Sequence, residues 1–141
     1  MAALSMGSPW VLVALAGLNG FIAVAASAFG AHGLEDKLSP AALALFEQAA
    51  FFQLTHAIAL AVLGAISLWR GERPIRGIGF AAMGFLIGIL CFCGSLYWLA
   101  INGSGSLGPF HWVTPIGGTC LIIGWGVLTV SSMRFALSNR A

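Results

Sequence analysis

The sequence predicts an all-α integral membrane protein, folded as an antiparallel bundle of four transmembrane helices. Of the 141 residues, 60% are hydrophobic and only 7% are charged, whereas soluble domains carry about 25% charged residues. Four long apolar runs each reach the roughly 20 residues that cross a hydrocarbon layer about 30 Å thick. The runs lack the strict alternation of strands, so they predict helices. We expect a single transmembrane domain over residues 1–141, with spans at 10–31, 43–69, 78–101 and 112–133.

The first run, Trp10–Ala31, has small residues near its end, as a signal peptide would. No Lys or Arg precedes it and its apolar stretch exceeds a normal signal core, so we expect it to remain as the first span. Asn19 lies near its middle and is expected to bond across the bundle. Small residues recur at spacings of three or four, which favours close helix packing; they are Ala16, Gly20, Ala23, Ser27 and Gly30.

The second helix is predicted to begin before its apolar run, which starts at Leu43. Ser39 is a good N-cap, and Pro40 suits the first helical position. A helix from there to Trp69 would be about 45 Å long, which exceeds the membrane core. The outer membrane boundary then falls near Ala49, so Glu47 stays at the interface while Gln53 and His56 lie inside.

The third and fourth runs carry the clearest small-residue stripes. One stripe on the third contains Gly84-x-x-x-Gly88 and consists of Gly77, Ala81, Gly84, Gly88, Cys91 and Ser95. The fourth offers Gly117, Cys120, Gly124 and Ser131. Because lipid supplies no hydrophobic drive for helix association, such stripes predict close backbone packing. The cysteines, Cys91, Cys93 and Cys120, are odd in number and lie in apolar runs, so we expect buried thiols rather than disulfides.

The loops predict the orientation, with both termini in the cytoplasm. Five of the six basic residues fall on the side that holds the termini and the 70–76 loop; they are Arg70, Arg73, Arg76, Arg134 and Arg140. The positive-inside rule assigns that side to the cytoplasm. Tryptophans near the span ends agree with interfacial belts; they are Trp10, Trp69, Trp98 and Trp112. We therefore expect a multi-pass protein of the bacterial cytoplasmic membrane.

The polar residues give the candidate site. Ionisable side chains inside a membrane are costly, so they are functional candidates. We predict a ligand-binding site or polar core from His32, Glu47, Gln53, His56, Ser95, Tyr97 and Thr114. His32 and Glu47 are the best-matched pair at the outer end, and Tyr97 is most simply an interfacial anchor. No catalytic motif is present, and no spacing indicates a metal or cofactor, although His32, His111 and Glu47 reach the ligand count that zinc needs.

The chain also resembles a known family, the domain of unknown function 423 family, whose eukaryotic relatives are called transmembrane protein 256-like. The matching blocks cover nearly the whole chain and are SAFGAHGL (Ser27–Leu34), FQLTHAIAL (Phe52–Leu60), FCGSLY (Phe92–Tyr97), TPIGG (Thr114–Gly118) and GW (Gly124–Trp125). The resemblance implies a small four-span membrane protein and supplies no established activity. Its matching motif residues are His32, Gln53, His56, Ser95, Tyr97, Thr114 and Pro115.

Three functions stay open at this point. The first is a non-enzymatic accessory or interaction protein, held together by small-residue packing and interhelical bonds, with a membrane-protein partner or a second copy besides the lipid bilayer. The second is a small-solute or proton-linked transport or binding protein whose polar site opens outward. The third, a membrane enzyme or redox protein, rests only on the histidines and cysteines. A net charge of +2 is too small for nucleic-acid binding.

Overall fold

A computed structural model describes residues 8–71 and 75–138, and this part of the chain is helical without strands. Four of its helical stretches are long and apolar enough to cross a membrane, which confirms the predicted fold class. The first two are α1 (Pro9–Gly33) and α2 (Pro40–Arg70); the third runs through α3 (Ile78–Gly88), a π-helical turn η1 (Ile89–Cys93) and α4 (Gly94–Asn102); the fourth joins the 3-10 turn η2 (Gly108–Phe110) to α5 (Val113–Ser138).

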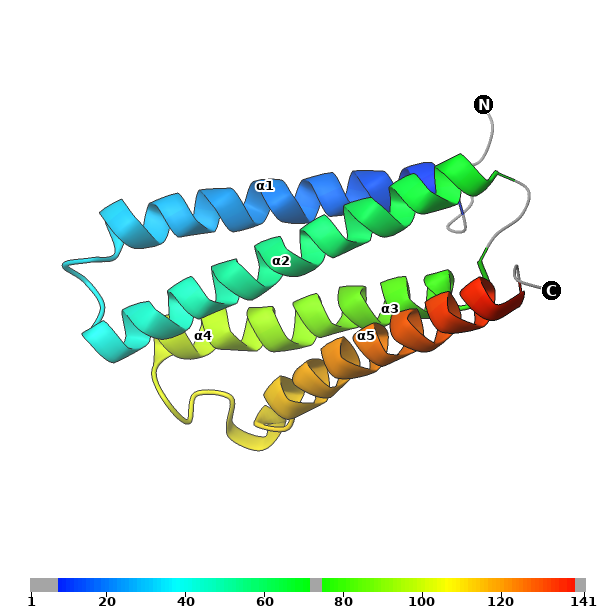
Figure 1. The fold of residues 1–141 in the computed structure, drawn as a ribbon. Coiled ribbons are helices and arrows are strands. Elements are labelled where there is room, and N and C mark those ends of the chain that lie inside the picture. Colours follow the sequence, from blue (N-terminus) through cyan, green and yellow to red (C-terminus); the bar gives the residue numbers. More distant parts are fainter. Residues whose placement is uncertain (1–7, 72–74, 139–141) are drawn as a thin grey trace, which may run out of the picture.

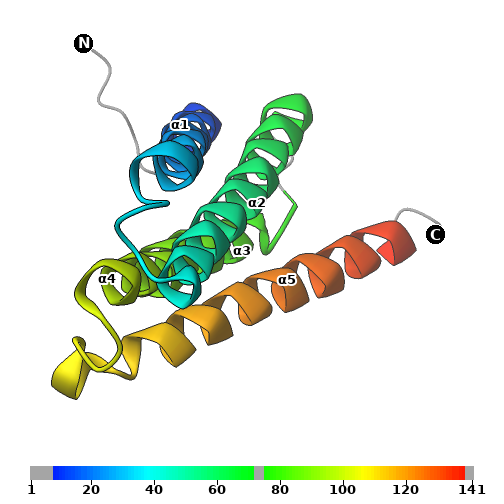
Figure 2. The ribbon, with the colours of Figure 1, turned by 90° about the vertical axis from the view of Figure 1, so that its left-hand side faces the viewer.

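The helices run antiparallel, and both ends of the chain lie at the same end of the bundle (Figure 1). The view along the bundle shows α1 and α5 in outer positions, with α2 and the α3–α4 span between them (Figure 2). The main contacts agree, since α1 packs chiefly on α2, α5 packs on α3 and η1, and α2 packs on α4. The two central helices therefore bury the most surface, and the outer two remain largely open to lipid.

Helix α2 begins where the sequence predicts, because Ser39 caps it. The Ser39 hydroxyl accepts a hydrogen bond from the Ala42 backbone N–H at 3.3 Å, and Pro40 occupies the first turn. The helix ends at Arg70, and its C-cap residue Gly71 has a φ of 55°, which favours glycine. With these two ends, α2 has 31 residues, which is longer than the membrane core requires, as the sequence predicts. Gln53 and His56 lie in its middle part and are buried in the bundle.

Glycines bring the α3–α4 span and α5 into close contact. A methyl group at Gly84 would lie 3.0 Å from the Cys120 carbonyl oxygen and 3.1 Å from the Gly124 Cα. One at Gly117 would collide with the backbone of Cys91 and Phe92. The predicted stripes of these two spans thus face each other within one chain.

The third span departs from the continuous α-helix that the sequence predicts. Its middle, Ile89–Cys93, is a π-helical turn between Gly88 and Gly94. A π-turn adds one residue to a helical turn and shifts the register of the later residues in the span. The Ser95 hydroxyl donates to the Phe92 carbonyl at 2.8 Å and so satisfies one backbone group of this irregular segment.

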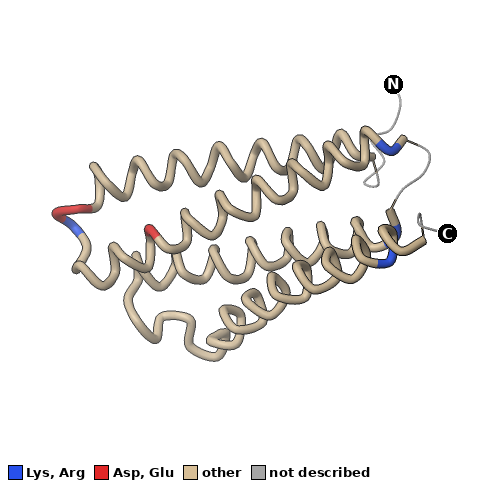
Figure 3. Tube along the Cα trace, viewed as in Figure 1, with Lys and Arg blue, Asp and Glu red and all other residues tan. Residues whose placement is uncertain are grey.

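The described arginines and carboxylates lie towards opposite ends of the bundle, and Lys37 lies in the loop with Glu35 and Asp36 (Figure 3). Arg70, Arg76 and Arg134 lie at the end that holds the termini, whereas Glu35, Asp36 and Glu47 lie towards the other end. Arg73 and Arg140 fall outside the described residues. The interior between the two ends of the described bundle contains no charged residue, so its buried polar contacts rest on neutral groups.

Candidate functional site

Gln53 joins three helices through its side-chain amide. It lies on α2, is only 5% exposed, and donates from Nε2 to Asn19 Oδ1 on α1 at 3.2 Å. Its Oε1 accepts a hydrogen bond from the Tyr97 hydroxyl on α4 at 3.0 Å. Asn19 in turn donates from Nδ2 to the Leu15 carbonyl at 2.9 Å. The amide therefore connects α1, α2 and α4 at one level.

His56 lies one turn further along α2 and joins it to α5. Its Nδ1 is 2.7 Å from the Phe52 carbonyl oxygen, and its Nε2 is 3.1 Å from the Trp125 indole nitrogen. A carbonyl can only accept and an indole N–H can only donate. His56 is therefore a neutral imidazole with its proton on Nδ1. A ligand or metal bound at Nε2 would have to displace Trp125.

Ser95 and Thr114 join the α4 segment to α5. The Thr114 hydroxyl donates to Ser95 Oγ at 2.8 Å, and the Ser95 hydroxyl donates to the Phe92 carbonyl. Ser95 is buried and Thr114 is half-buried. This pair sits beside the π-turn, so it fixes α5 to the irregular part of the third span.

Aromatic rings enclose the imidazole of His56. Its centroid is 5.3 Å from that of Phe85 and 6.0 Å from that of Phe52, which it stacks on nearly parallel. Phe85 also lies 5.0 Å from the Trp125 ring, and Phe52 lies 5.0 Å from Phe92. The other neighbours of the imidazole are apolar rings, so its polar contacts are the hydrogen bonds with the Phe52 carbonyl and the Trp125 indole.

The structure does not bring His32 and Glu47 into this site. Both side chains are exposed near the end of the bundle opposite the termini, and within the described residues neither makes a side-chain hydrogen bond or ion pair. On α2, Phe46 is buried in the core, whereas the next residue, Glu47, is exposed. In the described part of the chain, the structure therefore shows no contact that pairs His32 with Glu47 or joins either of them to Gln53 and His56.

The candidate metal ligands remain apart as well. Across residues 8–71 and 75–138, no three His, Cys, Asp or Glu side chains converge as a metal site would require. His111 is exposed, and its Nδ1 lies 3.1 Å from the Gly108 carbonyl oxygen in the loop before α5. The three cysteines are free thiols.

We call the side chains that join the helices by these hydrogen bonds the polar core; they are Asn19, Gln53, His56, Ser95, Tyr97, Thr114 and Trp125. Two of them, Asn19 and Trp125, are missing from the site that the sequence predicts. The sequence singles out Trp125 only within a family block, and Asn19 only as an interhelical bond without an assigned partner. One signal for Trp125 is its position, since it stands mid-span while the other described tryptophans lie near span ends. Tyr97, expected as an interfacial anchor, instead directs its hydroxyl to Gln53.

Comparisons with known proteins fit this architecture. The family described as "Protein of unknown function (DUF423)" matches residues 26–118. A UPF0382 membrane protein of Staphylococcus epidermidis is 43% identical, with 89% of this chain and 98% of the relative covered. One of Haemophilus influenzae is 40% identical, with 85% and 91% covered. No solved structure matches. This chain, a multi-pass membrane protein with bacterial relatives, therefore belongs to the DUF423 family.

Proposed function

We propose that this protein is a non-enzymatic accessory or interaction protein of the membrane, in which the polar core holds the helices in one arrangement. The observation that carries the proposal is that the buried polar side-chain atoms have hydrogen-bond partners. Within the described residues, no buried side-chain nitrogen or oxygen lacks a hydrogen-bond partner. Polar side chains that each already have a partner inside the bundle stabilise the association of its helices.

The transport alternative would need polar groups beside a water-filled path. Four hollows lie at the arginine end and along the sides of the helices, and Gln53, His56 and Tyr97 line none of these four, although Trp125 lines one between α2 and α5. Since the Gln53 amide lies between Asn19 and Tyr97, it would also interrupt a proton relay through them. These observations favour the accessory role over proton-linked transport.

The first experiment compares Gln53→Leu with Gln48→Leu in mild detergent. Gln53 makes two interhelical hydrogen bonds, whereas Gln48 is exposed near the outer interface. Interhelical bonds in membranes contribute about 0.6 kcal/mol each and up to about 1.7. We expect Gln53→Leu to lower the melting temperature by about 3–8 °C and Gln48→Leu to leave it within about 1 °C.

The same proteins, reconstituted in liposomes with an internal pH dye, test the alternative. The proposal expects no flux above that of empty liposomes. Protein-dependent proton flux that Gln53→Leu abolishes, while the variant remains folded, would replace the accessory role by transport.

The accessory role also predicts a larger assembly in native membranes. After gentle solubilisation, blue native electrophoresis should show the chain in a band heavier than the purified protein at the same detergent concentration. Identical migration of the two would argue against a stable partner.

A further inference from the structure

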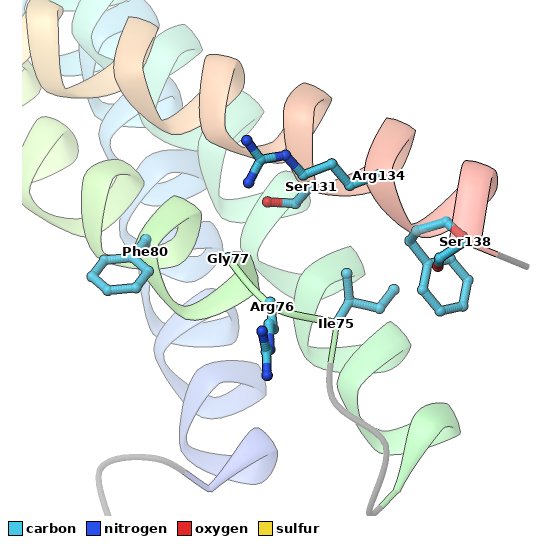
Figure 4. A pocket seen from close by; sticks show the side chains of 8 residues that line it. Ile75, Arg76, Gly77, Phe80, Ser131, Arg134 and Ser138 are labelled. Carbon is cyan, nitrogen blue, oxygen red and sulfur yellow. The ribbon is translucent and has the colours of Figure 1, made fainter.

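A pocket of about 570 Å³ opens between the start of α3 and the end of α5, at the end of the bundle that holds the termini (Figure 4). We call it the basic pocket because two arginines line it, Arg76 and Arg134. Ser131 and Gly77 lie between them, and Phe80 forms an apolar wall (Figure 4). The pocket shares no residue with the polar core.

The hydrogen-bond donors of the basic pocket have no partners in the described chain. Arg76 and Arg134 are exposed, and neither makes an ion pair or hydrogen bond within residues 8–71 and 75–138. The Ser131 hydroxyl is likewise without a partner there. Guanidinium groups present planar sets of donors that match phosphate oxygens. The free donors and positive charge therefore suit a phosphate group.

One wall of the pocket is fixed by a cation–π contact. The Arg70 guanidinium carbon from the end of α2 lies 4.5 Å from the centre of the Phe135 ring. Phe135 lines the pocket together with Ile75 and Phe80. The pocket thus combines cationic donors with apolar surface, which is the pattern of an amphipathic ligand.

A shallow groove of about 440 Å³ leads from the basic pocket along α5. It shares Ser131 and Arg134 with the pocket and continues to Ile123. The distance from Arg134 to Ile123 is about 16 Å at the helical rise of about 1.5 Å per residue. Gly126 floors the groove, and no atom lies within 4 Å of where its Cβ would be. An extended acyl chain fits such a trough.

We propose that the basic pocket binds one anionic phospholipid. Its phosphodiester lies beside Arg134 and Ser131, whose hydroxyl donates a hydrogen bond, Arg76 adds its positive charge from the other side of Gly77, and one acyl chain lies along the groove to Ile123. The pocket lies at the basic end of the spans, where anionic headgroups attract arginines. A free phosphate or a soluble phosphate ester would use the arginines but leave the groove empty. The inference does not depend on the proposed function.

The test is native mass spectrometry of the full chain in mild detergent, titrated with phosphatidylglycerol or with phosphatidylcholine of the same acyl chains. Arg76→Gln and Arg134→Gln are compared with Lys37→Gln, which removes one positive charge at the other end of the bundle. Each arginine near a headgroup contributes about fivefold to binding. We expect one preferred phosphatidylglycerol, bound about fivefold more weakly by each arginine variant and normally by Lys37→Gln.

The groove has its own pair of variants, Gly126→Phe and Gly17→Phe. Both glycines face open space, so both substitutions leave the helix packing intact. Gly126→Phe should weaken phosphatidylglycerol binding at least threefold, and Gly17→Phe should not. The lipid site would be overturned if the protein retained the two lipids equally, or if both arginine variants bound phosphatidylglycerol as the wild type does. It would also be overturned if glycerol phosphate competed fully and Gly126→Phe did not change phosphatidylglycerol binding.

Discussion

His56 shows how two hydrogen-bond partners fix the tautomer of one buried side chain. The Phe52 carbonyl requires a proton on Nδ1, and the Trp125 N–H requires a lone pair on Nε2. A proton on Nε2 would face the Trp125 indole N–H, and the hydrogen bond between His56 and Trp125 of α5 would be lost. An ionisable residue in a membrane segment can thus be part of the packing without being a charged site.

Trp125→Phe tests this contact, because it keeps a ring against Phe85 and removes only the indole donor. We expect the melting temperature to fall by about 2–5 °C, which corresponds to the loss of one interhelical hydrogen bond. Thermal unfolding followed by tryptophan fluorescence or scanning calorimetry would measure it. A variant as stable as the wild type would mean that His56 does not depend on Trp125.

Two threonines on α5 offer a matched comparison. Thr114 donates to Ser95 of the third span at 2.8 Å, whereas Thr129 donates at 2.9 Å to the Trp125 carbonyl of its own helix. Thr114→Val should lower the melting temperature by about 2–4 °C, and Thr129→Val should leave it unchanged or slightly higher. Equal effects would show that the bond to Ser95 adds nothing to the association of the helices.

At the scale of the helices, glycine sets the distance between the third span and α5. Gly117→Ala should force the backbones apart and cost about 1–3 kcal/mol, because its new methyl group would meet the backbone of Cys91 and Phe92. Gly126→Ala, on the open face of the same helix, should instead stabilise α5 by up to about 1 kcal/mol. Unfolding in mixed micelles with added denaturing detergent would compare the two.

The helices themselves could be predicted from the sequence, because length, hydrophobicity and the Ser39–Pro40 cap act locally. The rotation of each helix could not, since it depends on contacts between segments far apart in the chain. For this reason depth and spacing indicate Gln53 and His56 but do not assign their partners, Asn19 and Trp125. The same limit applies to His32 and Glu47, which the sequence suggests as a pair and the structure leaves exposed without a contact between them.

For the whole molecule, the separation of charges predicts which end faces the cytoplasm. The described arginines lie at the end of the termini, and the described carboxylates lie towards the other end. Ser138→Cys and Ser104→Cys, each exposed at one of these ends, can be labelled in intact cells with a membrane-impermeant maleimide. We expect Ser104→Cys to react at once and Ser138→Cys only after lysis. The opposite pattern would reverse the orientation.

The π-turn in the third span lies at the centre of a helix that contacts both α2 and α5. Before the turn, Gly84 and Gly88 keep the span close to α5; after it, Tyr97 reaches Gln53 on α2. The single extra residue of the π-turn changes the helical register between α3 and α4. Because the turn already accommodates one extra residue, deletion of one residue within Ile89–Cys93 would close it into a regular α-helical turn and leave Tyr97 directed towards Gln53.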